Sequence, residues 1–528
     1  MYGRTIKSSV DAKRGGRAMA RRGRERMRTA AAEPVARAGY RQIELPYAPM
    51  EILDAEGIEA IHEASLSILA TIGMRVLCPR ARAVLGRAGA RVADEIVRLD
   101  PEMVAEKVAL APSEFLLEAR NPARSVRLGG RYALFASVAG PAFISDLERG
   151  RRAGTYAEMC DFIRLVQCLD ILHQEGGGPF EPLDLRQDRR HLDLFFAQAT
   201  LTDKNWQPTG LGRERAEDAL AMAALAFGVS LEDLAERVVF TCVINTNSPL
   251  TLDLAMAEGL MTMAAHGQAA IVTPFTLSGA MSPVTLAGAI AQQNAEALFG
   301  IVLTQCVRPG VPVIYGGFTT NVDMRTGSPA FGTPEYAQAA QITGQLARRY
   351  GVPFRSSNAT ASNDCDAQAA YESQMSIWGA LTGHAHLLYH AAGWLGGGLT
   401  ASFEKLILDA EMLQMMAHYM IPPKIDTASL GLDAIADVGH GGHFFGTAHT
   451  LERYQTAFYT PLVSDWSNYE TWSEGGAKSA TLRANEIWKR MLAACEKPPI
   501  DPGVEEALAD YVARRKSEIE RGIGVPRA

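Results

Sequence analysis

Short apolar segments alternate with longer amphipathic ones along most of the chain. Seven of the short segments begin at Asp170, Asn205, Val238, Ala269, Val311, Pro353 and Leu387. Each is followed by residues whose apolar positions recur at helical spacing. Because parallel strands need a helical crossover between them, this order predicts a parallel sheet covered by helices.

The length of the repeating unit favours one fold of this class. Units of about 35 to 50 residues suit a (β/α)₈ TIM barrel better than an open sheet. We therefore expect an α/β protein built on such a barrel, with an N-terminal helical and β extension and a C-terminal helical extension. Two segments could supply the eighth strand, residues 142–147 or residues 435–446. An open doubly wound sheet is the alternative fold.

Changes in composition divide the chain into four parts. Residues 1–41 carry twelve Lys or Arg against three acids and no hydrophobic block, which predicts a solvated basic arm, with a handle for an acidic partner as the alternative. Residues 42–150 are expected to form a helical and β-rich cap, and residues 151–435 the barrel. Residues 436–528 begin with a Gly-, His- and aromatic-rich segment, either a lid or a subunit contact, and end in helices packed on the barrel.

Net charge and cysteine usage limit the expected binding partners and the expected compartment. The net charge of −7 disfavours a general nucleic-acid or anionic-membrane binder. The seven cysteines are scattered without a CxxC pair, which favours mostly buried free thiols in a reducing compartment. Without an apolar run long enough to span a membrane, the sequence predicts a cytoplasmic protein.

The expected strand ends are rich in amides, hydroxyls and aromatic rings. Reactive groups of a (β/α)₈ barrel lie at these ends, and Glu175 is the single carboxylate among them. No His or Cys set has ligand spacing for zinc, so we predict no bound metal. Aromatic faces attract a desolvated ammonium, and quaternary ammonium ions above all.

Several long motifs occur in the order found in a known family. They are "YGGFTTNVDMRTGSPAFGTPE", "DAQAAYES", "GLTASFEKLILDAEM" and "GHGGHFFGTAHTLERYQTAFYTPLVSDWSNYETWSEGG". From about residue 40 to about residue 515 the chain resembles the trimethylamine methyltransferase family. The resemblance implies a barrel whose mouth receives the cobalamin of a separate corrinoid protein, a methyltransferase activity and a homo-oligomer.

One departure from the family pattern bears on the substrate. Members that act on trimethylamine carry pyrrolysine at a position matching the segment between Ser356 and Asp366, and this chain has only standard residues there. It therefore resembles the non-pyrrolysine branch, whose members use glycine betaine and related quaternary amines. A quaternary nitrogen leaves as a neutral amine, so its methyl transfer needs no general acid.

The strand ends and the resemblance together predict the site residues. Glu175, Tyr389 and His390 are expected in catalysis. Substrate contacts are predicted for Tyr315, Phe318 and Phe403, and for His440 and His443 to a betaine carboxylate. Asn358, Ser362 and Asp364 mark the loop at the pyrrolysine position.

Three other functions stay open from the sequence. They are a barrel that binds a betaine or a corrinoid without turnover, a tertiary amine methyltransferase lacking pyrrolysine, and a metal-dependent lyase or hydrolase. The sequence also does not choose among quaternary amines such as glycine betaine, carnitine and choline.

Overall fold

The main sheet of the protein is mixed in its pairing and curled. The computed structural model describes residues 39–525, so almost all of the expected basic arm lies outside the described residues. The parallel strands of the main sheet are β7 (Tyr132–Ser137), β10 (Gln174–Glu175), β11 (Asn205–Trp206), β12 (Thr241–Ile244), β14 (Ala269–Val272), β16 (Val313–Gly316), β19 (Phe354–Ser357) and β20 (Leu387–Ala392). They are ordered β11-β10-β7-β20-β19-β16-β14-β12. A parallel bridge between Trp206 and Phe240 also links the segments at the two ends of this order.

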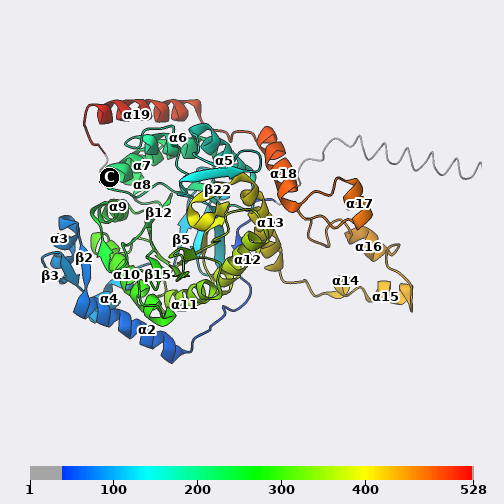
Figure 1. The fold of residues 1–528 in the computed structure, drawn as a ribbon, viewed down its shortest axis with the longest axis horizontal. Coiled ribbons are helices and arrows are strands. Elements are labelled where there is room, and N and C mark those ends of the chain that lie inside the picture. The colour runs from blue at the N-terminus through cyan, green and yellow to red at the C-terminus, as the bar shows by residue number, and fades with distance from the viewer. Residues whose placement is uncertain (1–38, 526–528) are drawn as a thin grey trace, which may run out of the picture. The chain divides into compact units, whose positions relative to one another are not determined.

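A helix follows each parallel strand before the next one begins. These helices are α5 (Tyr156–Cys168), α6 (Arg190–Leu201), α7 (Arg213–Phe227), α9 (Leu254–Ala265), α10 (Leu286–Val307), α11 (Pro334–Tyr350), α12 (Ala367–Thr382) and α13 (Phe403–Tyr419). Figure 1 shows them arranged around the strands. The predicted alternation of strands and helices is therefore confirmed. Thr333 caps α11 by accepting from the backbone N–H of Tyr336, next to a proline at the first helical position.

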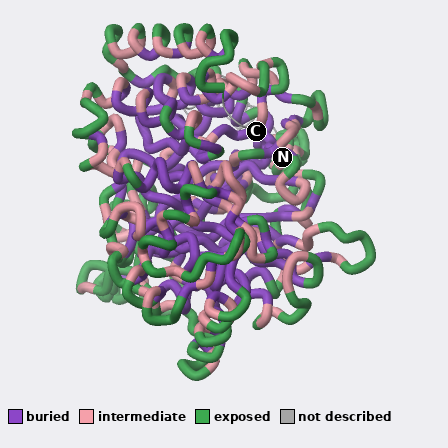
Figure 2. The backbone as a smooth tube through the Cα atoms, turned by 90° about the vertical axis from the view of Figure 1, so that its left-hand side faces the viewer, coloured by how far each residue is buried: buried purple, intermediate pink, exposed green. Residues whose placement is uncertain are grey.

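Burial explains why the strands are short apolar runs. All four residues of β14 and all four of β16 are buried, because helices cover one side of the sheet and side chains fill the other. Figure 2 shows this buried centre surrounded by exposed helix surfaces. On the inner side, Leu134, Ile271, Ile314 and Leu387 share one apolar cluster with Tyr389.

The eighth parallel strand is β7, and neither predicted segment supplies it. β7 pairs in parallel with β10 and β20. Residues 143–146 form β8 in a separate sheet, and residues 435–446 form the end of a helix and a loop. The expectation failed because β7 also pairs with antiparallel neighbours, β1 (Ile43–Glu44) and β6 (Val126–Gly129), so that its sequence surroundings are those of a local hairpin. β5 (Glu114–Leu117) extends this antiparallel edge through β6.

Smaller sheets and helices lie outside the main sheet. One sheet contains β2 (Met74–Val76), β3 (Arg91–Ala93), β4 (Ile96–Arg98) and β13 (Thr251–Leu252), a second contains β15 (Phe275–Ser278), β17 (Phe318–Val322) and β18 (Pro329–Ala330), and a third contains β8 (Phe143–Asp146), β9 (Gly150–Arg152), β21 (Trp394–Leu395) and β22 (Thr400–Ser402). The accompanying helices are α2 (Ala55–Ser67), α3 (Pro79–Arg87), α4 (Pro101–Val108) and α8 (Leu231–Leu234), and the short helical turns are η1 (Ile68–Ile72), η2 (Pro122–Arg124) and η3 (Gly396–Gly398).

Helix α10 is long and apolar enough to cross a membrane, alone among the helices of residues 39–525. Most of its residues are buried, and it packs between the strands and helices α2, α4 and α9. Such burial is what a central helix of an α/β fold requires.

After α13 the chain continues in short helices and then in two longer ones. They are α14 (Thr427–Leu430), α15 (Leu432–Val438), α16 (Ala448–Arg453), α17 (Tyr469–Glu474), α18 (Ala480–Ala494) and α19 (Pro502–Glu520). Helix α18 packs on α13, and α19 packs on α6 and α7. A disulfide joins Cys168 at the end of α5 to Cys495 after α18. The expectation of free thiols is therefore wrong for these two cysteines, because the packing of α18 on α5 brings together residues that the sequence separates by 327 positions.

Candidate active site

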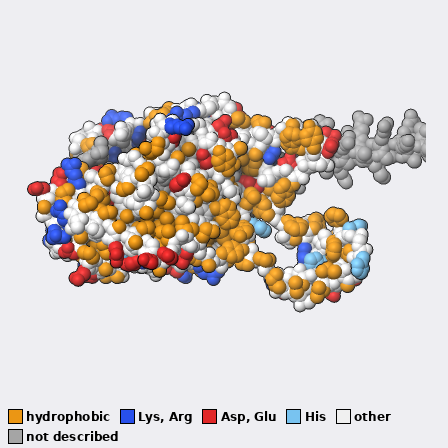
Figure 3. Space-filling view, turned by 60° about the horizontal axis from the view of Figure 1, so that its bottom comes forward, with side chains coloured by type: hydrophobic (Ala, Val, Ile, Leu, Met, Phe, Trp, Pro, Cys, Tyr) orange, Lys and Arg blue, Asp and Glu red, His pale blue; other side chains and the backbone are white. Residues whose placement is uncertain are grey.

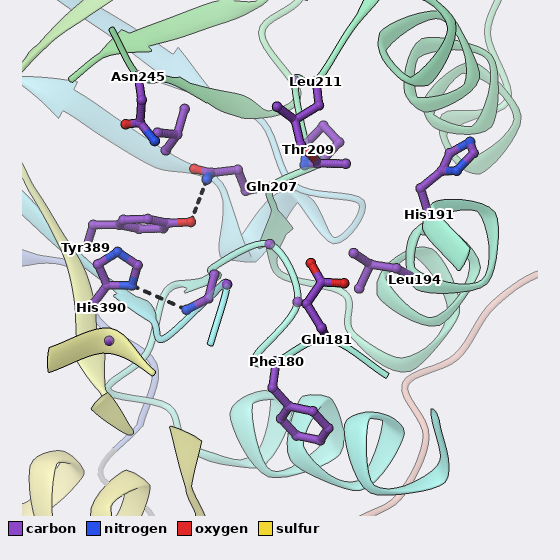
Figure 4. A pocket seen from close by; sticks show the side chains of 18 of the residues that line it. Phe180, Glu181, His191, Leu194, Gln207, Thr209, Leu211, Asn245, Tyr389 and His390 are labelled. Atoms are coloured by element: carbon purple, nitrogen blue, oxygen red, sulfur yellow. Dashed lines mark hydrogen bonds between the residues drawn. The ribbon is translucent and has the colours of Figure 1, made fainter. Parts of the chain in front are cut away.

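A cavity of about 550 Å³ lies at the carboxyl ends of the parallel strands. In parallel α/β folds this is the edge at which ligands bind. Every parallel strand, or the segment after it, contributes lining residues, among them Ala139, Gly177, Gln207, Asn245, Thr273, Phe318, Arg355 and Tyr389. Figure 4 shows Gln207, Tyr389 and His390 lying next to one another in it.

Arg355 is a buried cation on this cavity. It lies on β19 with only 2% of its surface exposed, and its Nε and Nη1 atoms have no hydrogen-bond partner. The guanidinium carbon stands 5.2 Å from the ring centroid of Phe318 and 4.9 Å from that of Tyr389. Burial lowers the pKa of Arg355 to about 10, so it stays charged at neutral pH. A buried charge of this kind requires an anion, and Arg355 forms no salt bridge to any described residue.

His390 adds a neutral hydrogen-bond donor. Its Nδ1 accepts a hydrogen bond from the backbone N–H of Ala139 at 3.3 Å, so the neutral ring carries its proton on Nε2. Burial and the charge of Arg355 hold the pKa of His390 well below its ordinary value. The ring packs against those of Tyr389 and Trp394, at centroid distances of 4.0 and 4.4 Å.

Tyr389 and Glu175 fix the glycine loop that follows β10. The Tyr389 hydroxyl donates to the carbonyl of Gly176 and accepts from Nε2 of Gln207 at 2.7 Å. The Glu175 carboxylate accepts from the backbone N–H groups of Gly177 and Gly178, both at 3.0 Å. Both glycines have positive φ, 113° and 92°, which this tight loop requires. Burial raises the pKa of Glu175 to about 7.

Aromatic rings form a further part of the cavity wall. Phe180, Phe275, Phe318, Tyr389 and Trp394 all line it. Phe318 packs on Phe275 and on Trp394, with centroids 5.4 and 6.0 Å apart. The faces of such rings attract a quaternary ammonium ion.

Carboxylates are scarce around the cavity. Among the described lining residues Glu181 is the only one, and it forms an ion pair with Arg190 at 2.5 Å. Within residues 39–525, no group of three or more His, Cys, Asp or Glu side chains is arranged to hold a metal ion. The site thus combines a buried cation, a neutral donor and aromatic faces, which suits a ligand with one anionic and one cationic end.

Comparisons with known proteins identify the family. The family model for trimethylamine methyltransferase (MTTB) matches residues 18–520. The chain belongs to the trimethylamine methyltransferase family. It is 37% identical to the glycine betaine methyltransferase of Desulfitobacterium hafniense (strain Y51), over 89% of this chain and 98% of that protein.

More distant relatives of the same family are trimethylamine methyltransferases. One from Desulfitobacterium hafniense (strain DSM 10664 / DCB-2) is 28% identical over 88% of this chain and 93% of its own length. Among solved structures, the hydroxylamine MtmB complex aligns with a TM-score of 0.46 and 11% identity, over 85% of this chain and 91% of that one. The resemblance inferred from the sequence motifs is confirmed, and the protein is a member of a methyltransferase family.

The structure brings together some of the residues predicted for a family member's site. Tyr389, His390 and Phe318 line the cavity. Glu175 lies behind the cavity wall and holds the glycine loop. Its predicted part in catalysis stays a prediction.

Other predicted residues lie away from the cavity. Tyr315 faces the covering helices, where its hydroxyl donates to Oδ1 of Asn294 at 2.8 Å, because neighbouring residues of a strand point to opposite faces and Ile314 takes the inner one. Phe403 begins α13 and stacks on Trp488 at 4.7 Å. His440 and His443 are exposed in the segment between α15 and α16.

The loop at the pyrrolysine position is tied to its surroundings. Nδ2 of Asn358 donates to the carbonyl of Ala391 at 3.0 Å. The Ser362 hydroxyl donates to the carbonyl of Asp364 and to the Asp366 carboxylate, at 3.1 and 3.0 Å. None of Asn358, Ser362 and Asp364 lines the cavity.

Arg355 is a residue of the cavity that the sequence analysis missed. A signal for it exists, because it is the only Lys or Arg within the seven predicted strands. A charged residue inside an otherwise apolar strand must face a ligand or a partner, since leaving it unpaired in a core is costly.

Proposed function

We propose that the protein transfers a methyl group from a zwitterionic quaternary amine, glycine betaine first among them, to the cobalt(I) of a corrinoid carried by a separate protein. The observation that carries the proposal is the buried, unpaired guanidinium of Arg355 beside a wall of aromatic rings. The 37% identical relative is a glycine betaine methyltransferase, which supports the same substrate class.

We infer that the main sheet is a closed (β/α)₈ barrel. The order of its eight parallel strands and the bridge between Trp206 and Phe240 support this inference. Closure would bring the loops after all eight strands around one cavity, which agrees with the origin of the lining residues. The cytoplasmic location expected from the sequence likewise remains a prediction.

In this proposal the two ends of the substrate bind to different groups. Arg355 and the Nε2 proton of His390 hold the carboxylate, since a charge-assisted hydrogen bond to a guanidinium is strong in a buried site. The rings of Phe275, Phe318 and Tyr389 contact the trimethylammonium group. Binding at these two anchors directs one N-methyl group away from the carboxylate, and the aromatic rings displace water from the cation where they contact it.

The residues present fit chemistry supplied by a partner's corrinoid. Gly140, Gly178 and Gly398 line the cavity without side chains that would fill it, and the lining holds no acid placed to protonate a leaving group. A bound corrinoid would supply the nucleophile that accepts the methyl group. The C–N bond breaks with its electron pair on nitrogen, so a neutral tertiary amine leaves and needs no proton from the protein.

Replacement of Arg355 tests the proposal. We expect Arg355→Met to weaken glycine betaine binding in calorimetry by about 10- to 100-fold, the loss of a charge-assisted pair of about 1.5 to 3 kcal/mol. Methyl transfer to cob(I)alamin, followed by its absorbance, should fall in kcat/KM by a similar factor. The thermal midpoint should not fall, because the variant removes a buried charge that has no anionic partner among the described residues.

Controls separate this result from a general defect. Arg75→Met changes an arginine whose side chain is 58% exposed and should leave both readouts unchanged. Choline carries the ammonium without the carboxylate, so it should bind weakly to the native protein, and the loss of a like charge in Arg355→Met should not weaken its binding further. A native protein that prefers choline or trimethylamine to glycine betaine would contradict the proposal.

A further inference from the structure

Two neighbouring residues of β20, Tyr389 and His390, both line the cavity. Their ring centroids are 4.0 Å apart, and Figure 4 shows the two rings side by side. In a regular strand successive side chains point to opposite faces, so one of these two should face the covering helices instead. Leu387 and Tyr389 share the inner apolar cluster. His390 is therefore the residue that departs from the alternation.

The backbone of His390 explains this departure. Its φ is 52°, a left-handed conformation that residues other than glycine rarely adopt, because it strains the Cβ. The pairing of β20 with β7 is interrupted at the same place, where four residue steps of β20 lie against two of β7. His390 thus stands in a bulge that turns its side chain inward. The other non-glycine residues of 39–525 with positive φ lie in turns and loops, namely Asp94, Leu250, His384 and Ala477.

Asn358, which directly follows β19, binds the chain on both sides of His390. Its backbone N–H donates to the carbonyl of Tyr389 at 3.1 Å, and its Nδ2 donates to the carbonyl of Ala391 at 3.0 Å. Asn358 is fully buried and does not line the cavity. Its contacts therefore act on the backbone of the bulge and not on a ligand.

Asp409 on α13 holds the chain where the bulge ends. Its Oδ2 accepts from the backbone N–H of Gly393 at 2.9 Å. Lys405 forms a buried ion pair with the other oxygen of this carboxylate and donates to the Ser373 hydroxyl at 2.8 Å. The carboxylate is thus fixed from its other side, and the end of the bulge is tied to a covering helix.

We propose that Asn358 is a positioning residue, which holds His390 in the left-handed conformation so that two successive residues of β20 face the ligand. Backbone strain persists only where surrounding contacts maintain it, and the two hydrogen bonds from Asn358 are such contacts. An ordinary strand conformation at residue 390 would turn the imidazole toward the helices. The contact of His390 with a substrate carboxylate rests on the proposed function, whereas its backbone conformation does not.

Two substitutions of His390 measure the strain. In an ordinary strand position, glycine gives the less stable protein than alanine does. We expect the reverse here, because glycine adopts a φ of 52° without strain. The thermal midpoint of His390→Gly should therefore exceed that of His390→Ala. A higher midpoint for His390→Ala would show that the position carries no strain and would overturn the proposal.

Proton–nitrogen NMR spectra of the histidine side chains test the role of Asn358 without a ligand. The His390 signals are assigned by their loss in His390→Ala and should show a neutral ring protonated on Nε2. In Asn358→Ala we expect these signals to move toward those of exposed rings, for which His440 and His443 are the references. Figure 3 shows histidine side chains, in pale blue, on the surface of the segment that projects from the body. Unchanged His390 signals in Asn358→Ala would overturn the proposal.

Asn294→Ala is the matched control for Asn358→Ala. Asn294 is as fully buried as Asn358, and its Nδ2 binds the hydroxyls of Ser65 and Tyr350 among the covering helices, at 2.8 Å each. Its loss should lower the thermal midpoint but leave the His390 signals in place. Equal movement of these signals in both variants would assign the effect to general loosening and would contradict the positioning role.

A double variant keeps the test decisive if Asn358→Ala alone does not fold. Asn358→Ala/His390→Gly removes the strain together with the contacts that maintain it. We therefore expect the substitution of Asn358 to lower the thermal midpoint less in the His390→Gly protein than in the native one. An equal loss in both proteins, or a double variant that does not fold, would overturn the proposal.

Glycine betaine binding then connects the conformation to the site. Calorimetry should show about 10-fold weaker binding for Asn358→Ala and for His390→Ala, the loss of one hydrogen bond to a charged group. The combined variant should bind within about twofold of His390→Ala, because Asn358 acts through that ring. Losses that multiply would contradict the positioning role. A native protein that does not bind glycine betaine would contradict the proposed function, and the NMR spectra would still decide on Asn358.

Discussion

At the scale of single residues, the side chains around the cavity differ in their surroundings. Arg355 is buried without an anionic partner among the described residues. Phe275 lines the cavity, whereas Phe331 packs on Phe275 and Phe318 without lining it. Two phenylalanines of one cluster therefore differ in whether they can contact a ligand.

This difference predicts how the cation is bound. Phe275→Leu should weaken glycine betaine binding by about 3- to 30-fold, since a desolvated cation–π contact contributes about 0.5 to 2 kcal/mol. Phe331→Leu removes a ring from the same cluster and should leave the affinity within about twofold. Calorimetry with glycine betaine measures both, and equal losses in the two variants would assign the effect to packing alone.

At the scale of elements, two buried histidines join neighbouring strands of the main sheet. His173, directly before β10, accepts from the backbone N–H of Phe135 through Nδ1 at 3.1 Å. His386, directly before β20, accepts from that of Phe354 at 2.9 Å. Each side chain supplies an acceptor for a backbone N–H of an adjacent strand, in the middle of β7 for His173 and at the first residue of β19 for His386. Both rings must be neutral to do so.

Acid should therefore destabilise the fold. Burial lowers the pKa of His173 and of His386 to about 4 from 6.5, so the unfolded chain takes up protons first as the pH falls. Their contribution is complete above pH 6.5 and is lost between pH 6.5 and about 4, at roughly 2 kcal/mol for each histidine by pH 5. Urea denaturation between pH 7.5 and 5 measures the slope.

Two matched variants test whether the buried histidines cause the change of unfolding free energy with pH. His386→Gln should show a shallower loss of unfolding free energy with falling pH than the native protein. His440→Gln, at an exposed position, should keep the native slope. A native slope in His386→Gln would show that acid acts through other groups.

At the scale of the whole molecule, a buried carboxylate binds several side chains of the C-terminal helix α19. Asp218 on α7 accepts from Nε of Arg515 at 2.7 Å and from the Tyr511 hydroxyl at 2.8 Å. It also contacts Nε2 of His191, a residue of the cavity wall, at 3.0 Å. These contacts connect the end of the chain to the site.

Adjacent arginines on α19 give a matched test of this contact. Arg515→Ala leaves Asp218 buried with fewer donors and should lower the free energy of unfolding by about 2 to 4 kcal/mol. Arg514→Ala removes a side chain that is 56% exposed, forms an ion pair with Glu518 and stacks on the ring of Tyr511, and should cost about 1 kcal/mol or less. Urea unfolding distinguishes them, and similar values for both would exclude a special role for Asp218.

The sequence by itself determined the alternation of strands and helices, the family and the aromatic character of the site. Periodicity and motifs are local patterns, so they can be recognised without knowing which segments pack against one another. Tertiary structure decided that β7 pairs with β20, that Cys168 meets Cys495, and that Arg355 rather than Tyr315 reaches the cavity. These outcomes depend on which strand lies beside which and on which face turns inward, and both are fixed by contacts between residues far apart in the chain.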